Sequence, residues 1–387
     1  MNTKNVLLVA NWDWVIYNFR MALAASLKQQ GYDVTLISPY GKYVDELEAD
    51  GFRWIEWPLE RRSLNLFAEL NAIWKLAQIY EQESPDLIHH DTIKPNLYGA
   101  LAAQINTWRG VWEEPPQLLN SFMGIGFLFS QRPEAKLLRA LMLPVMRFAM
   151  RRNHVFTTFS NKVDQNTFLQ QYLVKSERTR VMISEFVNTE RFQARPNGKS
   201  DEEDLVVLMA ARLLWDKGVQ EFVSAAQTLH EDGVPVEFWL AGEPDTETPG
   251  FVPEDQLREW DQSGIINWLG YCSDMPDLLN RADIAVLPTH YNEGLPRFLV
   301  EAAATGLPLV ATDIEACRRV VEAGKNGFVI PKRSPEHLAE AVEKLVRNPT
   351  LRKTMGTASR KKAIDEFAER EVVEEWLDLY DYLLSEQ

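Results

Sequence analysis

The chain has 387 residues, of which 45% are hydrophobic and 25% charged, and its formal net charge is -15. This length exceeds what one hydrophobic core usually supports, so we expect two domains of roughly 190 residues each. The acidic balance argues against general nucleic-acid binding, which needs Lys and Arg clustered over a broad face. No apolar run is long enough to span a bilayer.

Cysteine usage and the amino terminus indicate a reducing compartment. Cys272 and Cys317 are too few for a disulfide framework, and "MNTKNVLLVANWDW" lacks the basic start and long apolar core of a signal peptide. We therefore expect a cytoplasmic protein, with any peripheral membrane contact made at the inner face.

Short apolar runs alternate with helical patterns in the first half of the chain. The runs are "NVLLVA" at 5–10, "DVTLIS" at 33–38, "PDLIHH" at 85–90 and "QLLNSF" at 117–122. Uninterrupted apolar runs of this kind are typical of strands in a parallel sheet that helices cover on both faces.

The same pattern starts again after the polar segment "RPNGKSDEED" at 195–204. The later runs are "LVVLMAA" at 205–211, "VEFWLAG" at 236–242, "IINWLG" at 265–270, "IAVLP" at 284–288 and "LPLVATD" at 307–313. We predict an α/β protein with two doubly wound, Rossmann-like domains that face each other across a cleft, with ligands at the carboxyl ends of the strands.

The predicted domains are an amino-terminal domain at 1–194 and a carboxyl-terminal domain at 195–368. An acidic amphipathic helix at 369–387 is expected to pack back on the amino-terminal domain.

Glu301 lies in the apolar stretch "RFLVEAAA", where an unpaired carboxylate would cost several kcal/mol. One interpretation is a polar ligand facing this carboxylate. The other is a buried salt bridge to Arg297 or Arg318, and the sequence leaves both open.

A helix is predicted to begin near Leu295, because Pro296 suits its first position and Gly306 suits its end. Glu293 would then stand just outside the helix, and Gly294 allows close backbone approach. Free amides at such a start form an anion site.

Two cations precede this helix along the chain. Arg212 lies at the carboxyl end of the strand at 205–211, and Lys217 follows in the loop before the next helix. Beside a cleft they could neutralise a diphosphate. The alternative is a pair of solvated loop charges.

Three long segments of the second half resemble the nucleotide-sugar domain of family 4 glycosyltransferases, retaining enzymes with the two-domain GT-B fold. They are "AARLLWDKGVQEFVSAA", "GYCSDMPDLLNRADIAVLPTHYNEGLPRFLVEAAATGLPLVATD" and "EAGKNGFVIP". Glu293 and Glu301 match the E-x7-E motif of that family.

This resemblance implies roles on the donor side. Arg212 and Lys217 would hold the donor diphosphate, and Glu301 the ribose hydroxyls. Glu293, with the amides of Gly294 and Leu295, would contact the transferred sugar and its phosphate. The backbone around Tyr271 and Cys272 would meet the base.

The first half of the chain looks like the amino-terminal domain of members that extend polyprenyl-diphosphate-linked or other cell-surface glycans. The resemblance therefore implies that the domain at 1–194 binds the acceptor and that the domain at 195–368 binds the nucleotide-sugar. The segments that carry this likeness are "NWDWVIYNFRMALAASLKQQGYDVTLIS", "HHDTIKPNLYGALAA" and "NSFMGIGFLF". The acceptor-side residues expected here are Asp13, Trp14, Lys94, Gly124 and Gly126. Asp13 and Trp14 are chosen because they follow the first strand, where a cleft residue is expected, although tryptophans at such a place are often structural.

One departure from the family pattern affects the amino-terminal sugar contact. The family often has His-x-His before Thr-x-Lys-Pro, whereas "HHDTIKP" matches with His89 and has Asp91 where the second His is expected. The contact belongs either to Asp91 or to a shifted His90.

The resemblance and the missing metal motif together predict a metal-independent transfer. No Asp-x-Asp motif stands at a strand end, and no carboxylate pair suited to double displacement is evident. We expect the acceptor hydroxyl to attack on the face that the nucleotide leaves, with the departing phosphate oxygen taking its proton. Neither a cofactor nor a metal is expected beyond the donor substrate, a UDP-sugar.

Residues 131–153 hold six basic residues and one acidic residue among Leu, Met and Phe. Such a segment suits peripheral contact with an anionic membrane. The alternative is a core helix with a basic outer edge, and Pro144 is expected to interrupt a long surface helix.

Two other functions share the predicted architecture. A nucleotide-sugar epimerase or hydrolase would act on the donor alone, and a non-catalytic nucleotide-sugar-binding subunit would form no product. A dehydrogenase is disfavoured because "LLVANWDW" has no glycines after the first strand.

Overall fold

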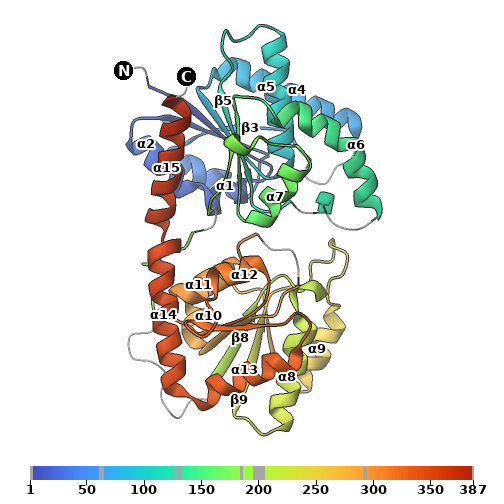
Figure 1. Cartoon of the computed structure of the whole chain (residues 1–387), viewed down its shortest axis with the longest axis vertical. Coiled ribbons are helices and arrows are strands. Elements are labelled where there is room, and N and C mark those ends of the chain that lie inside the picture. Colours follow the sequence, from blue (N-terminus) through green and yellow to red (C-terminus); the bar gives the residue numbers. More distant parts are fainter. Residues whose placement is uncertain are drawn as a thin grey trace. The chain divides into compact units, whose positions relative to one another are not determined.

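The structure is a computed structural model that describes residues 3–60, 65–125, 127–129, 133–183, 186–194, 205–290 and 294–385. It divides into two compact units (Figure 1). Unit 1 comprises Met1–Ser184 and Val372–Gln387, and unit 2 comprises Glu185–Glu371.

Unit 1 is built on a parallel sheet of seven strands in the order β3-β2-β1-β4-β5-β6-β7. The strands are β1 (Asn5–Ala10), β2 (Asp33–Ser38), β3 (Arg53–Glu56), β4 (Leu87–Asp91), β5 (Gln117–Phe122), β6 (Val155–Phe159) and β7 (Thr179–Val181). Because the order reverses between β1 and β4, that pair is the topological switch point of the sheet.

Helices cover the sheet of unit 1, as Figure 1 shows. They are α1 (Asp13–Phe19), α2 (Met21–Gln29), α3 (Val44–Ala49), α4 (Leu66–Glu83), α5 (Ile93–Trp108), α6 (Pro133–Met150), α7 (Lys162–Gln170) and α15 (Glu369–Ser385), with short 3-10 turns at Phe127–Phe129 and Ser176–Arg178. The central strands β1, β4, β5 and β6 are buried almost throughout.

Unit 2 has a parallel sheet of six strands in the order β10-β9-β8-β11-β12-β13. The strands are β8 (Leu205–Ala210), β9 (Val236–Ala241), β10 (Asn267–Gly270), β11 (Ile284–Leu287), β12 (Leu309–Thr312) and β13 (Gly327–Ile330). The order reverses between β8 and β11, so unit 2 repeats the arrangement of unit 1 and has its own switch point.

The helices of unit 2 follow the strands one by one. They are α8 (Val219–Glu231), α9 (Glu254–Gln262), α10 (Met275–Arg281), α11 (Arg297–Ala304), α12 (Glu315–Val320), α13 (Pro335–Arg347) and α14 (Pro349–Phe367), with a 3-10 turn at Trp215–Lys217. The predicted α/β class with two doubly wound domains is confirmed.

The carboxyl-terminal helix α15 packs against unit 1. Its Trp376 donates from Nε1 to the carbonyl of Ile183 at 2.8 Å, and its Asp381 accepts from the Tyr32 hydroxyl at 3.0 Å. The first residues of α15, 369–371, belong to unit 2, and the rest of the helix belongs to unit 1.

The first unit ends ten residues before the predicted boundary at 194. Residues 186–194 belong to unit 2, because Val187 forms a β-bridge with Ala368. The Arg360 guanidinium also donates to the carbonyls of Thr189 and Phe192.

Pro144 does not interrupt α6, contrary to the prediction, and the helix continues through it. A proline removes one intrahelical hydrogen bond, to the carbonyl four residues earlier. Here Pro144 and Ala140 both lie on the exposed side of the helix, so that carbonyl can be hydrated.

Helices that could cross a bilayer are not found within the described ranges, since none combines sufficient length with sufficient apolar character.

Candidate functional site at the switch point of unit 2

The loop after β8 and the loop after β11 meet at the carboxyl edge of the sheet in unit 2. Gly218 has a left-handed backbone, with φ of +86°, and a Cβ on it would lie 2.2 Å from the carbonyl oxygen of Pro288. Only glycine allows this close approach. The loop that carries Lys217 is thereby pressed against the loop that leads to α11.

Two further contacts join these loops. The amide of His290 donates to the carbonyl of Asp216 at 2.9 Å, and the Thr289 hydroxyl donates to the same oxygen at 3.2 Å. His290 Nε2 lies 3.5 Å from the Asp216 carboxylate. Lys217 is half-buried beside them.

Arg212 follows β8 and reaches solvent, with 55% of its side chain exposed. Its Nη1 lies 3.0 Å from Oδ2 of Asp245, which follows β9, and the Thr248 hydroxyl donates to the same oxygen at 2.6 Å. Because both partners sit at the sheet edge, Asp245 orients the guanidinium. An exposed pair of this kind is weak, so an anion can compete for the cation.

The helix α11 begins at Arg297, with Pro296 at its N-cap and Gly306 in a left-handed conformation just past its end. The helix therefore starts two residues later than predicted. Gly294 is half-buried and Leu295 is buried in the turn that leads into it. Its amino end faces the same edge of the sheet as Lys217, because α11 directly follows β11.

Glu301 is 7% exposed and pairs with Arg297, whose Nε lies 2.7 Å from Oε1. Burial raises the pKa of the Glu301 carboxyl, while Arg297 and Arg191 oppose this shift. Of the two salt-bridge partners considered from the sequence, Arg297 makes the bond, whereas Arg318 pairs with Asp313. A role toward ribose hydroxyls stays a prediction.

Tyr271 and Cys272 follow β10 at the same edge. Tyr271 is 72% exposed, and Cys272 is half-buried with a free thiol. Burial raises the pKa of this thiol. The structure therefore gathers Arg212, Lys217, Tyr271 and Cys272 with Gly294 and Leu295 at one sheet edge.

Two predicted site residues, Glu293 and Gly126, lie outside the described residues.

The switch point of unit 1 holds a buried ion pair. Arg20, between α1 and α2, and Asp91, at the end of β4, are each 1% exposed. Arg20 Nη2 and Nε lie 2.7 Å and 3.0 Å from the two carboxylate oxygens, and the guanidinium stacks 4.8 Å from the Trp376 ring centroid. Burial raises the pKa of Asp91, and Arg20 opposes this shift.

Both histidines next to Asp91 are fully enclosed. His89 bonds Tyr380 through Nδ1 at 2.8 Å and Ser121 through Nε2 at 2.6 Å. His90 bonds the Tyr80 hydroxyl at 2.7 Å and the Asn120 amide oxygen at 2.9 Å. Burial lowers the pKa of both, for His90 to about 4, so both rings are neutral at pH 7.

A catalytic role for His89 and Asp91 stays a prediction. In this structure both side chains serve packing within unit 1, and neither His90 nor Asp91 presents a polar atom to solvent.

Asp13, at the start of α1, is also buried. It accepts a hydrogen bond from the Tyr43 amide at 2.7 Å, and its carboxylate fills the space beside Gly41. Trp14 is half-buried and stacks on Trp12 with ring centroids 5.0 Å apart.

The remaining acceptor-side residues differ in access. Lys94, in the first turn of α5, donates to Glu69 at 2.7 Å and to the carbonyl of Glu60 at 3.0 Å. Gly124 follows β5, is half-buried and has open space around its Cα.

Within the described part of the chain, no group of three or more His, Cys, Asp and Glu side chains could hold a metal ion.

Sequence reasoning missed the residues that orient the site. Asp245 aligns Arg212, and Arg191 lies close enough to Glu301 to affect its pKa. The strand order could have suggested Asp245, because it follows the strand next to β8. Arg191 gives no local signal, since it is more than 100 residues from Glu301.

Comparison with known proteins identifies the family. The model for glycosyl transferase 4-like domains matches residues 5–160, and the model for glycosyl transferases group 1 matches residues 190–362. These matches follow one another and together cover most of the chain.

Full-length relatives are glycosyltransferases as well. The chain is 28% identical, over 96% of each chain, to N,N'-diacetylbacillosaminyl-diphospho-undecaprenol alpha-1,3-N-acetylgalactosaminyltransferase of Campylobacter jejuni. It is 24% identical to UDP-Gal:alpha-D-GlcNAc-diphosphoundecaprenol alpha-1,3-galactosyltransferase of Escherichia coli, over 92% of this chain and 90% of the relative.

A solved structure shares the fold. Anabaena HepE in complex with UDP superposes with a TM-score of 0.75 at 19% identity, covering 98% of this chain and all of HepE. With both domain models matched in order and the two doubly wound sheets in place, the chain belongs to the glycosyltransferases of GT-B fold, a 4-like domain followed by a group 1 domain.

Proposed function

We propose that this glycosyltransferase takes its sugar from a UDP-sugar and places it on a glycan linked to polyprenyl diphosphate. The observation that carries the proposal is the switch point of unit 2, where Arg212, Lys217 and the start of α11 share one sheet edge. Two cations and a helix start at one place suit a diphosphate.

The relatives support the choice of donor and acceptor. The names of the Campylobacter and Escherichia enzymes specify acceptors built on diphospho-undecaprenol, and the second name specifies UDP-Gal. HepE was crystallised with UDP.

We assign the donor contacts as the family resemblance implies. Arg212 and Lys217 bind the diphosphate, and the amides of Gly294 and Leu295, with Glu293, bind the sugar and its phosphate. Glu301 accepts hydrogen bonds from the ribose. The segment at Tyr271 and Cys272 lies against the base.

Glu301 can serve the ribose only in its ionised form, because a carboxylate accepts hydrogen bonds through both oxygens. Arg297 favours the ionised form of Glu301, because it lowers the pKa that burial raises. Only Oε1 is bonded to Arg297 Nε, which leaves Oε2 for a ligand hydroxyl.

The proposed reaction retains the configuration of the sugar and uses no metal. The acceptor hydroxyl oxygen forms a bond to the anomeric carbon as the bond from that carbon to the diphosphate breaks, on the same face. The proton of the hydroxyl passes to the departing phosphate oxygen. Arg212, Lys217 and the amino end of α11 stabilise the charge that grows on the diphosphate.

An acceptor linked to polyprenyl diphosphate lies in a bilayer. We therefore place the enzyme at the cytoplasmic face of a membrane and propose that residues 131–153 contact it.

The test is product formation. The wild-type protein is incubated with radiolabelled UDP-sugars and a polyprenyl-diphosphate-linked glycan, with EDTA, and the lipid fraction is counted. Transfer of label to the lipid, with α-linked product from an α-linked donor, supports the proposal. Release of free sugar or an epimerised donor without lipid product would indicate the hydrolase or epimerase, and no turnover with intact UDP binding would indicate a non-catalytic subunit.

A further inference from the structure

The loop after β9 brings a carboxylate to Arg212, a cation that we assign to the donor diphosphate. Its residues 243–252 run back along the segment that follows β8. The Leu213 amide donates to the Glu243 carbonyl at 3.1 Å, and the Val252 amide donates to the Leu213 carbonyl at 2.9 Å. Backbone hydrogen bonds therefore hold this loop both before and after its carboxylate, Asp245.

Asp245 is the fixed member of its ion pair with Arg212. The Thr248 amide donates to the Asp245 carbonyl at 2.8 Å, and the Thr248 hydroxyl donates to Oδ2 at 2.6 Å. The Asp245 side chain is 18% exposed, whereas the Arg212 side chain is 55% exposed. When the pair opens, the guanidinium is the group that can move, and the carboxylate keeps its position.

Asp245 occupies little of the hydrogen-bonding capacity of Arg212. Within the described residues, the bond from Nη1 to Oδ2 at 3.0 Å is the single hydrogen bond of the Arg212 side chain. A guanidinium has several more N–H donors, and these are available to a ligand. A phosphate group accepts two such donors side by side and carries more charge than one carboxylate. A diphosphate can therefore displace Asp245 from Arg212.

Displacement leaves the Asp245 charge close to the bound diphosphate. Because the hydrogen bonds of the loop hold the carboxylate, it does not withdraw far from the site. Two negative groups beside one cation repel each other, and solvent and salt weaken this repulsion without removing it. The same carboxylate is in place to bind Arg212 again when the nucleotide leaves. Asp245 therefore opposes tight binding of a diphosphate and favours its release.

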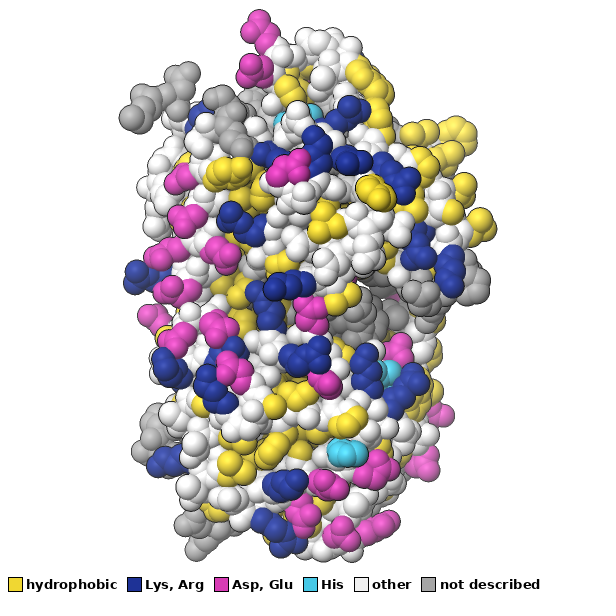
Figure 2. All heavy atoms as spheres, in the orientation of Figure 1, with side chains coloured by type: hydrophobic (Ala, Val, Ile, Leu, Met, Phe, Trp, Pro, Cys, Tyr) yellow, Lys and Arg dark blue, Asp and Glu magenta, His cyan; other side chains and the backbone are white. Residues whose placement is uncertain are grey.

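Direct contact with a cation of the site distinguishes Asp245 from other carboxylates of unit 2. Figure 2 shows Asp and Glu side chains interspersed with Lys and Arg side chains over unit 2, so charge alone does not single out one of them. Asp216, at the same edge of the sheet, is 57% exposed and lies 3.5 Å from Nε2 of His290. Asp245 instead bonds the arginine that follows β8 at the switch point.

We propose that Asp245 is the resident counter-ion of Arg212, which the donor diphosphate displaces and which binds Arg212 again as the UDP product leaves. Asp245 thereby shortens the time that UDP stays on the enzyme after transfer. This inference rests on the proposed function, because it takes Arg212 as a ligand of the diphosphate. It adds a residue that regulates product release at the same site.

Asp245→Asn tests the proposal in the full-length protein. Asparagine keeps the shape of the side chain and an oxygen that accepts hydrogen bonds from Arg212 and Thr248, so the variant removes the charge and retains the loop. Calorimetry should give a Kd for UDP about three- to fivefold lower than in wild type, which is the effect expected of an exposed ion pair. Stopped-flow displacement should show that slower dissociation of UDP causes most of this change.

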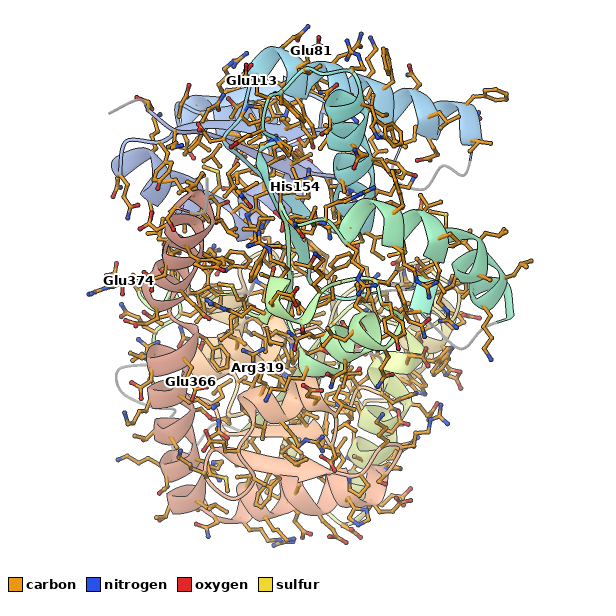
Figure 3. All side chains as sticks on the ribbon, turned by 45° about the horizontal axis from the view of Figure 1, so that its top comes forward. Glu81, Glu113, His154, Arg319, Glu366 and Glu374 are labelled. Carbon is orange, nitrogen blue, oxygen red and sulfur yellow. The ribbon has the colours of Figure 1, made fainter. Side chains whose placement is uncertain are left out.

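A ligand without phosphate and a variant outside the site are the controls. Uridine has no diphosphate, so its Kd should be the same for Asp245→Asn and wild type. Glu366, which Figure 3 labels on unit 2, is another exposed carboxylate in an ion pair, 2.8 Å from Nζ of Lys362. Glu366→Gln makes the same change in charge and should leave the Kd for UDP unchanged. Equal tightening in Glu366→Gln would overturn the proposal, because net charge would then explain the binding.

A double-mutant cycle tests whether Asp245 acts through Arg212. Arg212→Ala should weaken UDP binding, and in that background Asp245→Asn should tighten UDP binding clearly less than it does in wild type. An equal gain in both backgrounds would also overturn the proposal, because a general repulsion between Asp245 and the nucleotide would then be sufficient.

Product inhibition measures the same effect during turnover. The inhibition constant of UDP against the donor should fall in Asp245→Asn by the same factor as the Kd. The rate of a single turnover, which precedes the release of UDP, should not fall, because the variant removes a negative charge from a place where negative charge develops. A slower single turnover without tighter binding of UDP would show that Asp245 only aligns Arg212.

The two arginine outcomes keep this inference apart from the proposed function. If Arg212→Ala weakens UDP binding and Asp245→Asn does not tighten it, the inference is wrong and the proposed donor site stands. If Arg212→Ala binds UDP like wild type, the assignment of Arg212 to the diphosphate is wrong, and both proposals are overturned.

Discussion

At the switch point of unit 1, the charged side chains are enclosed and paired with one another, whereas at the switch point of unit 2 Arg212 reaches solvent and Lys217 is half-buried. Asp91 and Arg20 are each 1% exposed and hold each other in a bidentate contact. Arg212 is 55% exposed and meets a carboxylate by one bond. Both sheets have the same strand order around these points.

The comparison indicates that strand order determines where a ligand can bind. The side chains at that place determine whether a ligand does bind there. In unit 1 the carboxyl edge near β4 is filled from within, by α15 and by the start of α2. In unit 2 two loops meet around a glycine, and Arg212 beside them reaches solvent while Lys217 is half-buried. The predictions below test this contrast, in order of decreasing effect.

Asp91→Ala should cause the largest loss, because it leaves the Arg20 charge buried without a partner. We expect the free energy of unfolding to fall by roughly 3–5 kcal/mol. Urea unfolding measures it, with Asp365→Ala, which breaks the exposed pair with Lys361, as the control.

The variant Arg20→Met with Asp91→Leu removes both charges and should recover much of that loss. A change of less than about 1 kcal/mol for Asp91→Ala, as for a surface pair, would show that the ion pair does not hold unit 1 together.

Arg212→Ala should lower kcat by about 10² to 10³, equivalent to about 3–4 kcal/mol, with little effect on unfolding. The guanidinium stabilises charge on the leaving diphosphate and is mostly exposed, so the fold does not depend on it. Arg258→Ala, an exposed arginine of α9 in the same unit, is the control. A near-normal rate for Arg212→Ala would remove this catalytic role.

Gly99→Ala should destabilise unit 1 by about 1–3 kcal/mol, although alanine usually favours helices. A Cβ at this position of α5 would lie 2.0 Å from Nε2 of His90, which cannot move away because it bonds Tyr80 and Asn120. Thermal unfolding measures the effect. In a His90→Ala background the same change should cost less, and full additivity would rule out the steric cause.

Acid should destabilise unit 1 through its buried histidines. The pKa of His90 is lowered to about 4, so below about pH 6.5 the unfolded chain takes up a proton that the folded chain does not. The free energy of unfolding is therefore unaffected by His90 above the pKa of histidine in the unfolded chain. It declines as the pH falls from that value toward the pKa of His90 in the folded chain. The loss is about 1 kcal/mol per such histidine between about pH 6.5 and about pH 5.5.

Unfolding curves across this pH range measure how steeply the free energy of unfolding changes with pH. His90→Gln should reduce it, and His230→Gln, at an exposed position in α8, should leave it unchanged. An identical slope in His90→Gln would contradict the lowered pKa.

In unit 1 the sequence predicted four neighbouring strands and missed β3, β6 and β7. The buried strand β6 was missed because its sequence VFTTF has two threonines in place of an apolar run. The runs at 5–10, 33–38 and 117–122 coincide with β1, β2 and β5. The short strands β3 and β7 lie at the two ends of the sheet, where the apolar pattern weakens because one side lacks a neighbour.

For the site, the sequence indicated a residue whose partner is close along the chain, and it did not indicate partners that are distant along the chain. A charged residue inside the apolar stretch at Glu301 indicated a special position, and Arg297 four residues earlier was a visible partner. The sequence did not predict the burial of Asp91, because that burial depends on Arg20 and on Trp376 of the last helix. Contacts over such separations depend on the packing of the whole unit.

The central claim is that the donor nucleotide binds at the switch point of unit 2 and not at that of unit 1. Thermal unfolding with and without UDP, in the presence of EDTA, tests it on three proteins: wild type, Glu301→Ala and Lys94→Ala. We predict that UDP raises the Tm of wild type and Lys94→Ala equally and raises that of Glu301→Ala much less. An undiminished shift in Glu301→Ala, with the shift lost in Lys94→Ala, would place the nucleotide in unit 1 and contradict the account.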